Sequence, residues 1–132
     1  AFGADIIAGF PTESNEMFEN TLRIIDECDL TYLHVFPYSE REGTPAARIP
    51  DQVAPQLRKE RAARLRAKGK EKMSELLQRN LNKELEIIVE KGSKGHAQNF
   101  APIRLDTDME PGGLVRVRTH AIEGETLIAT VI

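Results

Sequence analysis

The sequence is poor in the residues that stabilise small secreted domains and in the long apolar runs that span membranes. It has one cysteine, Cys28, no tryptophan, and only five phenylalanines and two tyrosines. One thiol forms neither an internal disulfide nor a cysteine-ligated metal cluster, and no apolar run approaches the roughly 20 residues that cross a bilayer. Because the chain opens with Ala1 and without a basic-then-apolar leader, we expect a cytoplasmic protein that makes no membrane contact and whose numbering starts inside a longer chain.

Charge is unevenly distributed along the chain, although the total is only −3. Residues 1–55 carry three basic against ten acidic side chains, residues 56–79 nine against three, and residues 80–132 six against eight. The central block therefore has a net charge of +6 in an otherwise acidic chain. Such a block is typical either of an element that faces a polyanion or of a solvated helix face, and both interpretations stay open at this point.

The first part of the sequence has the pattern of a β-α-β unit. Residues 5–10 form a short apolar run closed by Pro11, Thr12 or Ser14 can cap a helix that continues to about residue 28, and residues 32–36 form a second apolar run. The apolar spacing of that helix predicts a buried Cys28. Two parallel strands do not make a stable sheet alone, so we expect further strands upstream or a dimer through the exposed sheet.

The rest of the chain predicts one long helix and then short strands. Pro55 suits a helix start, and the helical pattern runs to about residue 81, with Gly69 as a candidate kink. After Asn82 about five short strands alternate with turns, among them Lys91-Gly92-Ser93-Lys94-Gly95 and Pro111-Gly112-Gly113. Such spacing favours a small closed barrel, because closure removes exposed sheet edges.

Two runs of the first part carry a family resemblance. They are Asp5-x-Ile7-x-Gly9-Phe10-Pro11-x-Glu13 and Leu33-His34-Val35-Phe36-Pro37-Tyr38-Ser39-x-Arg41-x-Gly43-Thr44-Pro45. Over residues 1–54 the chain resembles the last strands of the radical S-adenosylmethionine barrel in methylthiotransferases, which add a methylthio group to tRNA adenosine or to a ribosomal protein. The second run looks most like the branch that acts on threonylcarbamoyladenosine, next to the tRNA anticodon.

The resemblance implies a cofactor pocket at the carboxyl ends of these strands, which is where ligands of α/β barrels lie. The residues expected to border S-adenosylmethionine are Gly9, Phe10, Pro11, Glu13, Tyr38, Ser39 and Arg41. Gly9 and Pro11 have an alternative role in ending a strand, and Glu13 in complementing a helix dipole. The family also uses two 4Fe-4S clusters, one of them held by a Cys-x-x-x-Cys-x-x-Cys run. Because this chain has no such run, we expect no cofactor bound to it, no catalytic residue or metal ligand in it, and no activity from it alone.

A second resemblance covers residues 79–132. Lys91-Gly92, then Gln98-Asn99-Phe100-x-Pro102-Ile103-Arg104-Leu105, then Pro111-Gly112-x-x-Val115-x-Val117-Arg118 are similar to the TRAM domain, a small RNA-binding β-barrel of several tRNA-modifying enzymes. RNA binding needs cations for phosphates and flat groups for stacking on bases. The residues expected to bind RNA are Lys91, Lys94, His96, Asn99, Phe100, Arg104, Arg116 and Arg118. Phe100 is either a stacking platform or a core residue. In the basic block, Arg61, Arg64, Lys68 and Lys72 are candidates to follow the RNA backbone.

Together these patterns predict an α+β fold in three parts. Residues 1–54 are the end of a radical S-adenosylmethionine (β/α) barrel, 55–78 a basic linker helix, and 79–132 an antiparallel, OB-like TRAM barrel. The predicted function is part of a tRNA methylthiotransferase whose partners are the tRNA anticodon arm and the N-terminal domains of the same protein. A ribosomal-protein methylthiotransferase and a stand-alone RNA-binding module are the alternatives.

Overall fold

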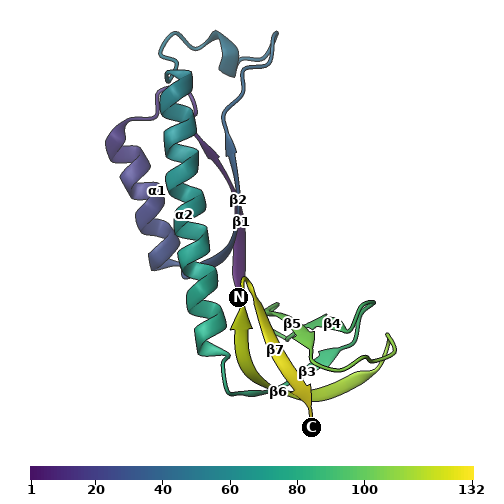
Figure 1. Cartoon of the computed structure of the whole chain (residues 1–132). Helices are drawn as coiled ribbons and strands as arrows, with labels where there is room; N and C mark the ends of the chain where they lie inside the picture. The colour runs from purple at the N-terminus through teal and green to yellow at the C-terminus, as the bar shows by residue number, and fades with distance from the viewer. The chain divides into compact units, whose positions relative to one another are not determined.

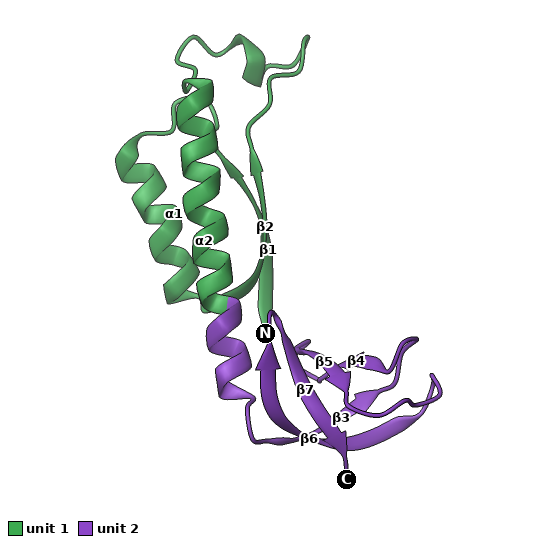
Figure 2. Ribbon diagram, viewed as in Figure 1, with its two compact units in different colours: residues 1–72 green, residues 73–132 purple.

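The computed structural model describes all 132 residues. The chain forms two compact units, unit 1 (residues 1–72) and unit 2 (residues 73–132), coloured separately in Figure 2. No helix combines the length and apolar character that crossing a membrane requires. The division into residues 1–54, 55–78 and 79–132 stays a prediction.

Unit 1 opens with the predicted β-α-β unit. Strand β1 (Phe2–Ala8) leads to helix α1 (Asn15–Glu27) and strand β2 (Leu30–Pro37), and the two strands pair in parallel with Ile6 opposite Val35. Ser14 caps α1, because its Oγ accepts the Met17 N–H at 3.1 Å. The β-α-β prediction is therefore confirmed, although β1 begins at Phe2 rather than at residue 5.

The rest of unit 1 consists of a short 3-10 helix, η1 (Ala46–Arg48), and most of helix α2 (Pro55–Arg79). Helices α1 and α2 lie on the same side of the two-stranded sheet (Figure 1). The core between these elements contains Ala8, Phe18, Ile25, Val35, Ala62 and Leu65. The helix runs through Gly69 without a break, and a kink there stays a prediction.

Cys28 lies on the surface, and the prediction of a buried cysteine was wrong. Helix α1 ends at Glu27, and Cys28 is its exposed C-cap residue. Helical spacing assigns a face only while the helix continues, and the chain turns away at this point, with Asp29 at a φ of 49°.

Unit 2 holds five strands: β3 (Glu84–Ile88), β4 (Lys94–His96), β5 (Pro102–Leu105), β6 (Leu114–Glu123) and β7 (Thr126–Val131). They form one curled sheet in the order β3-β6-β7-β5-β4. The number of strands and the α+β class agree with the sequence, whereas the purely antiparallel arrangement does not, because strands β5 and β7 are parallel. A bridge between Glu90, just after β3, and Lys94 of β4 joins the two ends of the sheet order, and the closed barrel stays a prediction.

Alternation along the strands of unit 2 separates a buried from an exposed face. Ile87, Ile103, Val117 and Leu127 are almost completely buried, whereas Glu86, Arg104, Arg116 and Arg118 are exposed. The inward side chains form the core of unit 2, and the charged side chains stand on the outside of the sheet.

Candidate functional site

A depression of about 470 Å³ lies where β1 and β2 end and the following loop begins. It is lined by Ile7, Phe36, Pro37, Tyr38, Ser39, Arg41, Thr44 and Ala46. Parallel pairing places Ile7 opposite Phe36, and the Tyr38 N–H donates to the Ala8 carbonyl at 2.7 Å. The two strands therefore bring their carboxyl ends to one edge, where three of the predicted cofactor residues, Tyr38, Ser39 and Arg41, are together.

Tyr38 has an unsatisfied polar group beside this depression. Its hydroxyl is buried and has no hydrogen-bond partner, and buried polar groups are normally paired. The Phe10 ring packs edge-on against the Tyr38 ring, with centroids 5.3 Å apart. Phe10 therefore supports the position of Tyr38 without lining the depression itself.

This arrangement fits one wall of an S-adenosylmethionine pocket. Ile7 and Phe36 are exposed apolar side chains of the kind that covers an adenine ring, and Ser39 and Arg41 offer polar contacts. The residues do not fit an iron–sulfur cluster, because thiolates hold such clusters and the one thiol of the chain, Cys28, is the exposed cap of α1.

Gly9 and Glu13 contact helix α2, and neither they nor Pro11 line the depression. A Cβ at Gly9 would stand 2.5 Å from Arg58 Cγ, and Pro11 is fully buried. Glu13 Oε1 accepts the Gly9 N–H at 3.0 Å and pairs with Arg61 at 2.9 Å. These contacts give the three residues a structural role that needs no ligand, and their assignment to the cofactor stays a prediction.

Arg58 is a further residue at this edge, and the sequence pattern did not single it out. Its Nε donates to the Val53 carbonyl and a terminal nitrogen pairs with Glu40, both at 2.8 Å. Its guanidinium also lies 5.1 Å from the centroid of the Tyr38 ring. One buried side chain of α2 thus holds the loop that forms the depression. No local signal distinguishes it from the other cations of the basic block.

The four cations of α2 that were candidates to follow an RNA backbone are paired with acids of unit 1. The pairs are Arg61–Glu13 (2.9 Å), Arg64–Glu19 (3.0 Å), Lys68–Asp26 (2.7 Å) and Lys72–Asp29 (2.8 Å). The hydrogen bond that Lys68 donates to the Asp26 carboxylate raises the pKa of Lys68. This side of the basic helix therefore faces the acidic N-terminal part of the chain, which accounts for the opposite charges of the two segments.

The cations expected to bind RNA in unit 2 form two groups on the outside of the sheet. Lys94 is the cross-strand neighbour of Arg104, which also pairs with Glu123 at 2.7 Å. Arg116 and Arg118 share one acid, Glu84, at 3.3 and 3.5 Å. These ion pairs lie on the surface, where such contacts contribute little to stability, so the guanidinium groups are able to exchange partners. Lys91 and Lys94 are exposed and form no ion pair.

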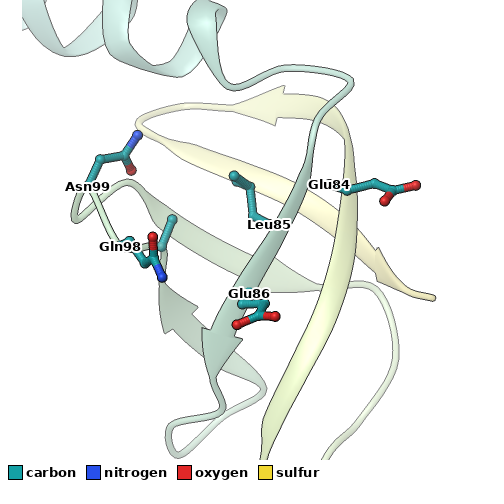
Figure 3. Close-up of a pocket in the computed structure, with 6 residues that line it drawn as sticks. Glu84, Leu85, Glu86, Gln98 and Asn99 are labelled. Atoms are coloured by element: carbon teal, nitrogen blue, oxygen red, sulfur yellow. The ribbon is translucent and has the colours of Figure 1, made fainter.

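Two adjoining depressions, of about 430 and 410 Å³, lie along β3 and share Glu86, Ala97 and Gln98. Figure 3 shows Gln98 and Asn99, on the loop between β4 and β5, across the first depression from Leu85 and Glu86. The second, called the β3 groove below, is lined by Glu86, Ile88, Glu90, His96, Ala97, Gln98, Phe100 and Leu114. The structure thus gathers three of the predicted RNA-binding residues, His96, Asn99 and Phe100, around these depressions.

Phe100 is 63% exposed, so its alternative role as a core residue was wrong. Its φ of 66° is unusual for a bulky residue. The Phe100 N–H donates to the Ala97 carbonyl at 2.8 Å, and the Asn99 side chain accepts the Ala101 N–H and donates to the Asn80 side chain, both at 3.1 Å. These bonds hold a loop that presents the ring to solvent.

Comparison with curated proteins finds relatives along most of the chain. A threonylcarbamoyladenosine tRNA methylthiotransferase, MtaB, of Rickettsia prowazekii is 51% identical over 93% of the chain, and the MtaB of Aquifex aeolicus is 34% identical over 89%. A tRNA-2-methylthio-N(6)-dimethylallyladenosine synthase of Alkaliphilus oremlandii is 44% identical over 93%. The chain spans 28 to 29% of the length of these three relatives. No family model matches it.

Proposed function

The chain belongs to the tRNA methylthiotransferase family, and we propose that it contributes two parts to such an enzyme, a cofactor wall in unit 1 and a tRNA-docking surface in unit 2. The observation that carries the proposal is the 51% identity to a threonylcarbamoyladenosine tRNA methylthiotransferase over 93% of the chain. The proposed substrate is threonylcarbamoyladenosine next to the anticodon, and the proposed location is the cytoplasm.

In unit 1, Tyr38, Ser39 and Arg41 form the proposed wall of the S-adenosylmethionine pocket of a radical S-adenosylmethionine barrel. Bound S-adenosylmethionine and iron–sulfur clusters, the latter on other parts of the enzyme, supply the radical chemistry, the methyl group and the sulfur. The residues of this chain orient the cofactor: Ile7 and Phe36 exclude water from its apolar part, and the Ser39 hydroxyl and the Arg41 guanidinium offer hydrogen bonds to its polar groups. In the full-length enzyme, addition of S-adenosylmethionine should shift the NMR signals of the Tyr38, Ser39 and Arg41 amides, and shifts confined to other residues would contradict this assignment.

In unit 2, which the proposal identifies as a TRAM domain, the outside of the sheet docks the anticodon arm. Lys91, Lys94, Arg104, Arg116 and Arg118 approach phosphates, and the exposed Phe100 ring stacks on a base. Phosphate contacts supply affinity that falls with salt, and stacking supplies affinity that depends on the ring. A dimer through the two-stranded sheet stays a prediction that sedimentation would test.

The deciding experiment titrates the chain with an anticodon stem-loop that carries threonylcarbamoyladenosine, over a range of salt concentrations. We expect binding that weakens with salt, and a salt slope that becomes shallower by about 0.7 to 0.9 for each phosphate contact removed by Arg104→Ala, Arg116→Ala or Arg118→Ala. Arg64→Ala is the matched control, because Arg64 is similarly exposed and also pairs with one acid, Glu19, but belongs to unit 1. Absence of salt-dependent binding, or an equal effect of the control, would refute RNA docking by unit 2.

A further inference from the structure

The β3 groove has an unusually apolar surface for an exposed site. Ile88 is 60% exposed and Leu114 67%, and they face each other as partners in the β3–β6 ladder. Phe100 reaches the same groove from the loop before β5. Three large apolar side chains thus line one depression of about 410 Å³. Clustered exposed apolar groups mark interaction sites far more often than single ones do.

The charges in the groove are negative, whereas those beside it are positive. Glu86 and Glu90 line it, and His96 is the one side chain of its lining that can become a cation. Arg116 is the ladder partner of Glu86 on the neighbouring strand, and Arg118 lies two residues further along β6. A phosphate is therefore repelled from the groove and attracted to its rim, which is the charge pattern expected where a nucleotide places its base inside and its backbone outside.

Glu86 is the acceptor best placed to contact a base. Glu84 pairs with the two arginines and Glu90 contacts His96 at 3.4 Å, whereas the Glu86 carboxylate makes no ion pair or side-chain hydrogen bond. A carboxylate accepts hydrogen bonds only. Adenine, cytosine and guanine each carry an exocyclic amino group that donates to such an acceptor, and uracil has none.

We propose that the β3 groove binds one unpaired nucleobase that carries an exocyclic amino group, stacked on Phe100, with its amino group donating to Glu86. This inference rests on the proposed RNA docking by unit 2 and adds to it a choice of base. Single-stranded RNA is recognised in this way elsewhere, through stacking on aromatic side chains and hydrogen bonds to the base edge.

The test compares RNA hexamers that differ in the amino group. Adenosine hexamers are paired with purine-riboside hexamers, and cytidine hexamers with pyrimidin-2-one-riboside hexamers, so that the second member of each pair lacks only the amino group. We expect the amino-bearing member of each pair to bind the full chain about 10-fold more tightly, the discrimination typical of a good hydrogen-bonded base contact. Glu86→Met should abolish this ratio. Removing a negative charge strengthens the binding of both members alike, so the ratio, and not the affinity, is the measured quantity.

Phe100→Asn removes the ring while asparagine tolerates the positive φ of this position, and it should weaken all four hexamers by about 10-fold. The matched controls are Glu125→Met, an exposed acid of unit 2 outside the groove, and Phe2→Asn, an exposed ring of unit 1. If binding stays salt-dependent and Glu86→Met leaves the affinity ratio within each pair unchanged, the proposed recognition of the base is overturned and the proposed RNA docking is not. Unchanged binding by Phe100→Asn also overturns the proposal. Absence of binding by every hexamer and by the stem-loop overturns both proposals.

Discussion

Replacing three glycines by alanine separates steric fit from backbone strain in unit 1. Gly9 has a φ of +77°, and a Cβ there would lie 2.5 Å from Arg58 Cγ and 3.0 Å from Arg58 Cα. Gly43 has a φ of +83° but nothing within 4 Å of its Cβ position, and Gly69 lies in α2 with Leu33 at 3.5 Å, an ordinary contact. An alanine would therefore meet backbone strain and a clash at Gly9, backbone strain alone at Gly43, and neither at Gly69.

The expected changes in unfolding free energy differ in sign as well as size. Gly43→Ala should cost about 1 to 2 kcal/mol for an L-residue in the left-handed region. Gly9→Ala should cost about 2 to 5 kcal/mol, because overpacking against the stem and backbone of Arg58 adds about 1 to 3 kcal/mol. Gly69→Ala should stabilise the chain by up to about 1 kcal/mol, since alanine is the better helix former and its methyl group meets Leu33 without a clash.

Urea unfolding followed by far-ultraviolet circular dichroism measures these differences. The chain has no tryptophan, and α1 with most of α2 lies in unit 1, so the helical signal reports that unit. If Gly9→Ala loses no more stability than Gly43→Ala, Arg58 does not pack on the end of β1 and the account of Gly9 is wrong. Destabilisation by Gly69→Ala would equally refute the fit of α2 against Leu33.

Two further predictions concern unit 2. The buried Thr119 hydroxyl donates to the Asn80 carbonyl and accepts the Lys83 N–H. Thr119→Val should therefore lower the unfolding free energy by about 1 to 3 kcal/mol. Thermal unfolding measures this loss, and an unchanged melting temperature would contradict it. Hydrogen bonds, first from Thr130 and then from His120, lower the pKa of Asp106. The ionised Asp106 carboxylate should therefore stabilise the fold above about pH 4, and this stabilisation should be lost as the pH falls below that value. Thr130→Val should raise the pKa of Asp106 measured by NMR, and an unchanged value would argue against the Thr130 contact.

Local patterns predicted the elements of unit 1 well, because each carries its own signal. The apolar runs before Pro11 and Pro37, the Ser14 cap and the proline at residue 55 mark strand ends and helix starts within a few residues. The start of β1 was missed because Phe2, Gly3 and Ala4 are strand residues through pairing with β2. That pairing is a contact between distant residues, which no local window contains.

Unit 2 and the candidate sites depend more on such distant contacts. Turn signals give five strands, but the parallel pairing of β5 with β7 requires β7 to pass between β5 and β6 in the sheet order, and no turn encodes it. A sequence motif also does not indicate which of its side chains are exposed to solvent. Phe100 is at the surface because the Asn80 side chain, 20 residues earlier, holds its loop through Asn99, and Arg58 is at the strand end because α2 packs there.

The basic block illustrates why a run of charge does not by itself identify an RNA-binding element. Its Arg61, Lys68 and Lys72 are within 3 Å of carboxylates that precede them by more than 40 residues, so much of the +6 charge is neutralised inside unit 1. Unit 2 itself has seven exposed cations: Arg79, Lys83, Lys91, Lys94, Arg104, Arg116 and Arg118. If each contacts one phosphate, at about −0.7 per phosphate on a single strand, docking by unit 2 should make the logarithm of the binding constant fall with the logarithm of salt at a slope no steeper than about −5. Because this limits the electrostatic share of the affinity, stacking on Phe100 should supply the rest, and Phe100 is therefore the first residue to replace.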